Sequence, residues 1–126
     1  ANFVKCLMNK GSYNNKQIIS ESSFNEMIKP GKFDQMFERD DNYNFIMGEN
    51  GRLKNNMNRY GVGLTISFDP NDSRPVGSIA HGGAACTFFS FNLEKQKGAL
   101  IFSNFYPYND KEWHEMVVAF ENEIYA

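Results

Sequence analysis

The sequence predicts an α+β fold, in which helices pack on an antiparallel sheet of about three strands. Apolar residues recur at helical spacing near both ends of the chain, and residues 60–105 hold β-type runs separated by turn-forming residues. At 126 residues the chain is one domain at most, or a piece of a larger one. We divide it into a helical part over 1–31, a loop-rich part over 32–59, antiparallel strands over 60–105 and a C-terminal helix over 109–125.

Two short helices are expected in the N-terminal part. Gly11 ends the first, and the second begins at the N-cap Ser20 and ends at Pro30. Because Ala1 already stands in an apolar helical pattern, we expect chain upstream of it. The apolar helix faces comprise Phe3, Cys6 and Leu7, then Phe24, Met27 and Ile28.

Residues 32–60 show no firm period and are rich in Asn and Gly towards their end. Loops of this length in compact domains often cover a binding site or are disordered. The sequence leaves these two alternatives open.

The stretch over residues 78–92 organises the sheet. It opens with small residues around Gly82 and Gly83 and then alternates as a strand does. We predict one strand here, whose start lines a cleft and whose body is core. Further strands are expected over residues 60–68 and 99–104, with a hairpin connection over 92–98.

The last helix is expected to be capped by Asn109 and to pack on the sheet. Its acidic residues, including Glu121, lie mostly off the apolar stripe. That stripe comprises Trp113, Met116, Val117, Phe120 and Ile124.

Composition and charge argue against several function classes. The net charge is −2, with no basic stripe, so nucleic acid is not an expected partner. No apolar run approaches the roughly 18 residues of a membrane span. His81 and His114 have no metal-ligand spacing with the cysteines, so we assign no metal and no cofactor. Cys6 and Cys86 could pair, but two buried free thiols are favoured.

The order of short motifs resembles the serine β-lactamase and penicillin-binding-protein-like family, in its class C and esterase-like branch. A Tyr60-Gly61-x-Gly63 strand precedes the His81-Gly82-Gly83 step, an aromatic strand, an Ala-Leu-Ile strand ending Ser103-Asn104, and a closing helix. The N-terminal residues 3–28 are similar to the helical segment that precedes the sheet in that branch. The resemblance implies the C-terminal portion of a β-lactamase/transpeptidase-like fold.

The resemblance also implies roles for four residues. His81, Gly82 and Gly83 would stand at the family's third motif, usually Lys-Thr-Gly, and contact the substrate. The amide of Ala84 would be one of two oxyanion-hole donors. From the residues alone, a turn or strand residue bonded to backbone is the favoured interpretation of His81, whereas the resemblance favours its role in the cleft. Family members often have Gly where Cys86 stands.

The family's catalytic Ser-x-x-Lys motif does not occur in this sequence. We therefore expect the chain to supply one wall of an acyl-transfer site, for a β-lactam, D-amino-acid peptide or ester, and to be inactive alone. The alternative is a β-lactamase-like scaffold used for binding or assembly. Family members are often exported, but the sequence gives no compartment. An unpaired sheet edge would favour self-association.

Overall fold

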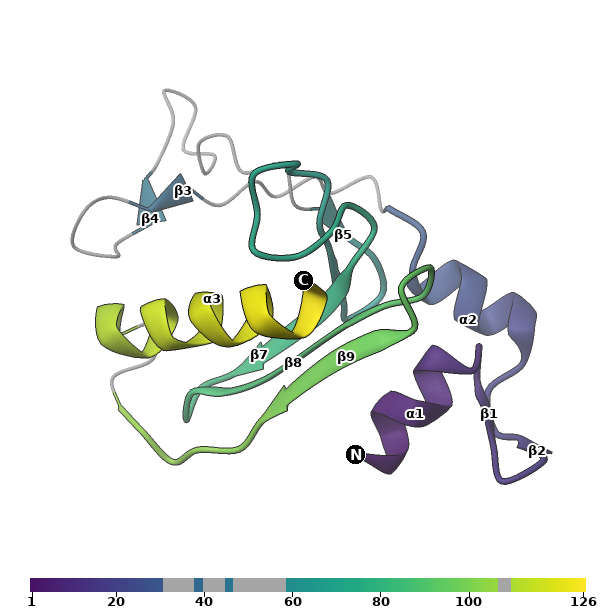
Figure 1. The fold of residues 1–126 in the computed structure, drawn as a ribbon. Helices are drawn as coiled ribbons and strands as arrows, with labels where there is room; N and C mark the ends of the chain where they lie inside the picture. The colour runs from purple at the N-terminus through teal and green to yellow at the C-terminus, as the bar shows by residue number, and fades with distance from the viewer. Residues whose placement is uncertain (31–37, 40–44, 47–58, 107–109) are drawn as a thin grey trace.

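The computed structural model describes residues 1–30, 38–39, 45–46, 59–106 and 110–126. They form an α+β fold with antiparallel sheets, which confirms the predicted class (Figure 1). The main sheet has five strands in the order β5-β6-β7-β8-β9, more than the predicted three or so. The strands are β5 (Arg59–Tyr60), β6 (Thr65–Ile66), β7 (Ile79–Gly83), β8 (Thr87–Asn92) and β9 (Lys97–Ile101).

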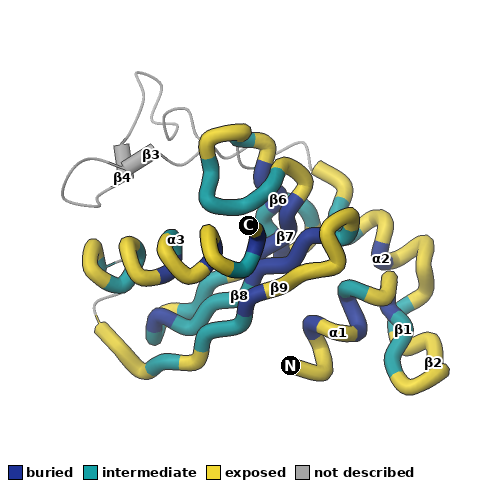
Figure 2. Tube along the Cα trace, in the orientation of Figure 1, coloured by how far each residue is buried: buried dark blue, intermediate teal, exposed yellow. Residues whose placement is uncertain are grey.

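Helices cover both faces of this sheet. The C-terminal helix α3 (Lys111–Tyr125) contacts β9 on one face, and α1 (Asn2–Met8) contacts β8 on the other (Figure 1). Side chains alternate along β8, so Phe88 meets Trp113 of α3, while Phe91 enters the core shared with α1 and α2 (Glu21–Met27). Figure 2 shows buried stretches along β6, β7 and β8. That core contains Val4, Leu7, Phe24, Leu64, Ile66, Ile79 and Phe91.

The N-terminal elements follow the expected signals. Ser20 caps α2, because its hydroxyl accepts a hydrogen bond from the Ser23 amide at 3.1 Å. Gly11 has φ +90 just beyond α1, a conformation that glycine adopts without strain. The polar turn between them is a hairpin of β1 (Ser12–Tyr13) and β2 (Lys16–Gln17), whose Asn14 and Asn15 both have positive φ.

The single strand predicted over residues 78–92 is wrong. β7 and β8 are two antiparallel strands, paired from Ile79↔Phe91 to Gly83↔Thr87 and joined by residues 84–86. Cys86, the last residue of this loop, has φ +55. A loop of this length commonly ends in a left-handed residue, usually glycine, so a cysteine there conceals the turn in the sequence.

The strand predicted over residues 60–68 is likewise two strands. β5 and β6 pair antiparallel, and the Gly61 amide donates to the Leu64 carbonyl at 2.8 Å within their turn. Gly63 has φ +74. The alternating Val62 and Leu64 therefore lie in a turn, where the period-2 pattern has no meaning. The predicted hairpin after residue 92 is confirmed, because Asn92 pairs with Lys97.

Within the loop-rich part, β3 (Glu38–Arg39) and β4 (Phe45–Ile46) form an antiparallel pair. The remaining residues of the predicted loop up to 58 lie outside the described residues. The choice between a loop that covers a binding site and a disordered one therefore stays open.

The C-terminal helix packs on the sheet as predicted, but with a different face. Asp110 is its N-cap, with its side chain accepting from the Trp113 amide, and the expected cap Asn109 lies outside the described residues. Met116 and Phe120 are 45% and 39% exposed, whereas Glu121 is 1% exposed. The predicted stripe is therefore wrong at these positions, because Glu121 finds polar partners on the sheet side. The buried residues of α3 are Val117, Glu121 and Tyr125.

Cys6 and Cys86 are both buried and are not joined in a disulfide, which confirms the favoured prediction for the two thiols. No helix in the described part of the chain is both long and apolar enough to cross a membrane.

Candidate functional site

The four residues named from the sequence lie together at the end of β7. His81, Gly82 and Gly83 are its last residues, and Ala84 opens the turn to β8. His81 and Ala84 are exposed, and the two glycines are half-buried. The His81 ring stacks on Phe89 of the neighbouring strand, with 6.4 Å between ring centroids. The step is thus an accessible stretch of strand and turn.

This end of β7 extends beyond its neighbour on one side. β6 pairs only with Ile79 and Ala80, whereas β8 continues alongside to Gly83. The Ala80 carbonyl points toward β6, since it accepts a hydrogen bond from the Thr65 hydroxyl at 2.7 Å. Backbone groups of alternate residues point to the same side of a strand, so the N–H and C=O of Gly82 also point to the side that β6 has left. Within the described part of the chain, no strand pairs with Gly82 on this side.

The Ala84 amide lies just past this end of β7. Among the described residues, none accepts a hydrogen bond from it. A backbone N–H held in a fixed position at the start of a turn is a dipole that can stabilise a developing negative charge.

At Gly83 the Thr87 side chain of the next strand occupies the space that a side chain would need. A Cβ at this position would lie 2.3 Å from the Thr87 hydroxyl, which is closer than real contacts allow. A larger residue at position 83 would therefore require the Thr87 hydroxyl to rotate away.

The β7–β8 turn is also hydrogen-bonded by Ser103, which lies shortly after the end of β9. The Ser103 hydroxyl lies 2.8 Å from the carbonyls of both Ala85 and Cys86, and it has one proton to share between them. Cys86 is fully buried. These contacts fix the two residues that follow Ala84. Sequence reasoning missed Ser103, because its partners come from a different hairpin.

A hollow of about 230 Å³ lies beside the step, on the sheet face that carries His81 and Phe89. It contains the three named residues of β7 together with parts of β8 and β9. Its lining is His81, Gly82, Gly83, Thr87, Phe88, Phe89, Leu100, Ile101 and Phe102.

The opposite sheet face holds a polar cluster that the sequence did not reveal. Glu121 accepts a 2.6 Å hydrogen bond from the Ser73 hydroxyl and lies 3.6 Å from Arg74 Nε. Arg74 also pairs with Asp72 at 3.1 Å. The four-residue spacing from Val117 to Glu121 was the available signal for a buried carboxylate. The cluster joins α3 to the loop before β7.

Next to this cluster, Tyr125 and Ser90 share a hydrogen bond of 2.9 Å between their hydroxyls. Burial raises the pKa of the Tyr125 phenol to about 12, and nearby Glu121 adds to the rise. These contacts explain how α3 binds the sheet, and none of them faces the hollow.

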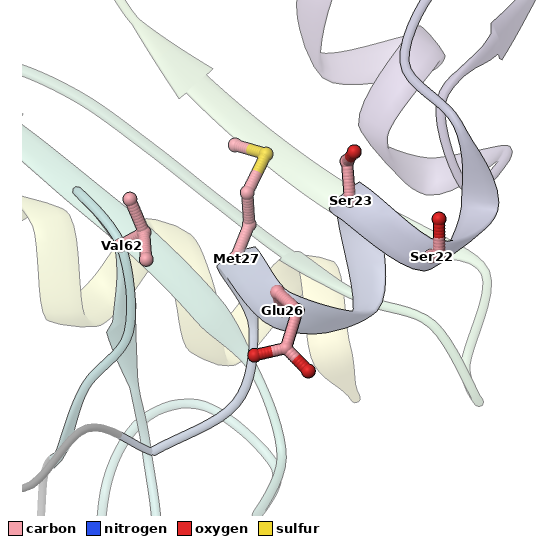
Figure 3. A pocket seen from close by; sticks show the side chains of 5 residues that line it. All are labelled: Ser22, Ser23, Glu26, Met27 and Val62. Carbon is pink, nitrogen blue, oxygen red and sulfur yellow. The ribbon is translucent and has the colours of Figure 1, made fainter.

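A second hollow, of about 340 Å³, lies where α2 meets the turn after β5 (Figure 3). Its polar side chains already have partners: Ser22 and Ser23 each bond to Ser20, and Glu26 pairs with Lys29. Figure 3 shows the Glu26 carboxylate directed away from the Met27 side chain. We assign no chemistry to this hollow. Among the described residues, no group of three or more metal-binding side chains gathers.

Comparison with models of known protein families finds no match for this chain, and a search of curated proteins finds no similar sequence.

Proposed function

We propose that this chain forms one wall of the acyl-transfer site of a serine hydrolase of the β-lactamase-like type. The substrate is a β-lactam, a D-amino-acid peptide or an ester. The observation that carries the proposal is the Ala84 amide at the exposed end of β7, for which the described residues offer no acceptor. The resemblance around His81-Gly82-Gly83 supports it, since that motif stands at this strand end in the family.

In the reaction, a serine hydroxyl adds to the acyl carbon and its proton passes to a general base. The leaving group departs with a proton, and water then releases the acid and restores the serine. Because no Ser-x-x-Lys occurs in this sequence, the serine and its base come from outside these 126 residues. Ala84 donates its N–H to the oxyanion, which is typically worth about 10²–10³ in rate.

The Ala84 amide can be removed without changing the turn. Proline has no N–H and suits the first central position of such a turn, and Gly83 before it tolerates the extended conformation that proline imposes. In the full-length protein we expect Ala84→Pro to lower kcat for nitrocefin or a p-nitrophenyl ester about 10²–10³-fold. Ala84→Ser retains the amide and is the matched control, with activity expected within a few fold of the parent.

Equal activity of Ala84→Pro and Ala84→Ser would show that the Ala84 amide does not stabilise the oxyanion. The isolated chain is expected to show no turnover. If the isolated chain hydrolysed substrate and His81→Ala abolished that activity, the proposal that the nucleophile lies outside these 126 residues would be wrong.

The alternative function is a non-catalytic scaffold for binding or assembly. The absence of Ser-x-x-Lys from the chain favours it. Reading the full-length sequence discriminates the two: if the motif is missing there as well, and the full-length protein hydrolyses neither substrate, the scaffold function stands.

A further inference from the structure

Among the described residues, no helix covers one part of the sheet face opposite α3. At the end that carries Phe91, this face packs against α1 and α2. At the other end, the hollow beside His81 is bounded by Phe89, Leu100 and Phe102, and Phe102 is 78% exposed. Apolar surface therefore lies open directly next to the candidate oxyanion donor.

The lining of the hollow is mostly apolar and carries no Asp, Glu, Lys or Arg that could pair with a charged ligand. Proteins commonly bind carboxylates through Arg or Lys. Arg74 lies over the Phe88 ring, 5.5 Å from its centroid. It is also paired with Asp72 and Glu121 on the α3 side.

The hollow also limits the size of what it holds. Pockets that enclose a whole drug-sized ligand span about 300–1,000 Å³. At about 230 Å³, this one suits a part of a ligand, such as a short alkyl chain or a single ring. Gly82 and Gly83 belong both to the hollow and to the candidate acyl-transfer wall, so that part would be adjacent to the reacting group.

We infer that the hollow is a subsite for a neutral, apolar acyl chain, so that the preferred substrates are esters of short fatty acids rather than carboxylate-bearing β-lactams or peptides. The assignment of preference rests on the proposed function. The binding of an apolar chain by the hollow does not, and it can be measured on this chain alone.

Binding is tested by titrating the isotope-labelled chain with methyl hexanoate and, separately, with hexanoate, while recording amide resonances. Methyl hexanoate should shift the amides of Gly82, Gly83, Leu100 and Phe102. Hexanoate should bind at least about tenfold more weakly, because its charge has no partner in the hollow. Equal binding of both probes, or shifts confined to other parts of the chain, would overturn the inference.

Two variants locate the binding. Phe102→Ser removes an exposed aromatic wall of the hollow and should weaken methyl hexanoate binding at least about fivefold. Phe3→Ser makes the same change at a position on α1 that is 55% exposed and outside the hollow, and should leave binding unchanged. Leu100→Ala provides a second test within the hollow, with folding checked by circular dichroism.

Turnover by the full-length protein separates the two proposals. Preference for p-nitrophenyl hexanoate over p-nitrophenyl acetate and nitrocefin, lost in Phe102→Ser, supports both. Hydrolysis of nitrocefin in preference to the hexanoate ester supports the acyl-transfer function and overturns the apolar subsite. Binding of methyl hexanoate without any hydrolysis by the full-length protein overturns the acyl-transfer function and leaves the hollow as an apolar binding site.

Discussion

At Gly61 the backbone of the turn after β5 lies directly against the backbone at the end of α2. A Cβ at this position would lie 2.0 Å from the Met27 carbonyl oxygen, and the adjacent Val62 amide donates to that same oxygen at 2.9 Å. The obstacle is backbone, which cannot move aside as a flexible side chain does. The turn after β5 therefore docks on the end of α2 through a contact that only glycine allows.

We expect Gly61→Ala to reduce the free energy of unfolding by about 2 kcal/mol, because the methyl group forces the turn away from α2. Val62→Ala, at a side chain that is 68% exposed, is the control and should change it by less than about 0.5 kcal/mol. Urea denaturation measures both. A Gly61→Ala protein as stable as the parent would show that this contact does not form.

Tyr125 gives the protein a specific alkaline response. Its phenol ionises near pH 10 in the unfolded chain, and burial raises the pKa to about 12 in the fold. The folded state therefore keeps a proton that the unfolded state loses, so stability from this group is full below pH 10 and falls as pH rises towards 12.

For a shift of this size the loss amounts to roughly 2–3 kcal/mol between pH 10 and pH 12. Tyr125→Phe removes the titrating group, so its stability should decline less steeply over that window, although it lacks the bond to Ser90 at every pH. Urea denaturation at several pH values compares the two proteins. Parallel declines would mean that Tyr125 ionises alike in both states.

At the scale of elements, α3 illustrates why a helical stripe of apolar residues can mislead. Glu121 is buried because Ser73 and Arg74 reach it from the loop before β7. Its burial rotates the packed face of the helix towards Val117 and Tyr125, and Met116 is left on the outer side. A carboxylate becomes a buried residue only through partners distant in sequence, which periodicity does not register.

The corrected face makes a paired prediction. Val117→Ala removes two buried methyl groups and should lower the free energy of unfolding by about 2 kcal/mol. Met116→Lys should change it by less than about 0.5 kcal/mol, although the predicted stripe places both residues in the core. Thermal or urea unfolding decides between the two faces. If Met116→Lys lowered the free energy of unfolding more than Val117→Ala does, the apolar stripe predicted from the sequence would be the packed face after all.

Local signals predicted local structure well. Ser20 caps α2 and Asn92 begins the β8–β9 connection, since each signal acts within a few residues. The two missed turns have another cause. Cys86 occupies a left-handed conformation that its residue type disfavours, and the alternation at Val62 continues through a turn without a break.

For the candidate site, the sequence predicted where the strand end lies but not what supports it. The glycines indicated a close neighbour at the strand end, and at Gly83 that neighbour is the Thr87 hydroxyl. Ser103 and the apolar hollow depend on how β9 aligns with the β7–β8 turn, and no short motif encodes that alignment.

At the scale of the whole molecule, β9 is the outer strand of the main sheet. Among the described residues, it pairs with β8 on one side and with no strand on the other. Its far end leads into exposed aromatic residues, Phe102, Phe105 and Tyr106. Such an edge offers backbone groups to another chain.

We expect the chain to self-associate through this edge as its concentration rises, with an increase in mean mass by light scattering. Phe102→Lys places a charge at the end of the edge and should suppress the increase. Phe3→Lys, the same change on α1, should not. A monodisperse monomer at high concentration would exclude association through β9.

The meander of β7, β8 and β9 also bears on how the protein folds. Each strand pairs with its immediate successor across residues 84–86 and 93–96, so closing these loops costs little chain entropy. Contacts of low sequence separation form faster than distant ones. The β7–β9 meander, which carries Ala84, is therefore expected to form early during folding. Glu121 and Tyr125 of α3 can make their hydrogen bonds on the other face of the sheet only after the C-terminal helix docks there.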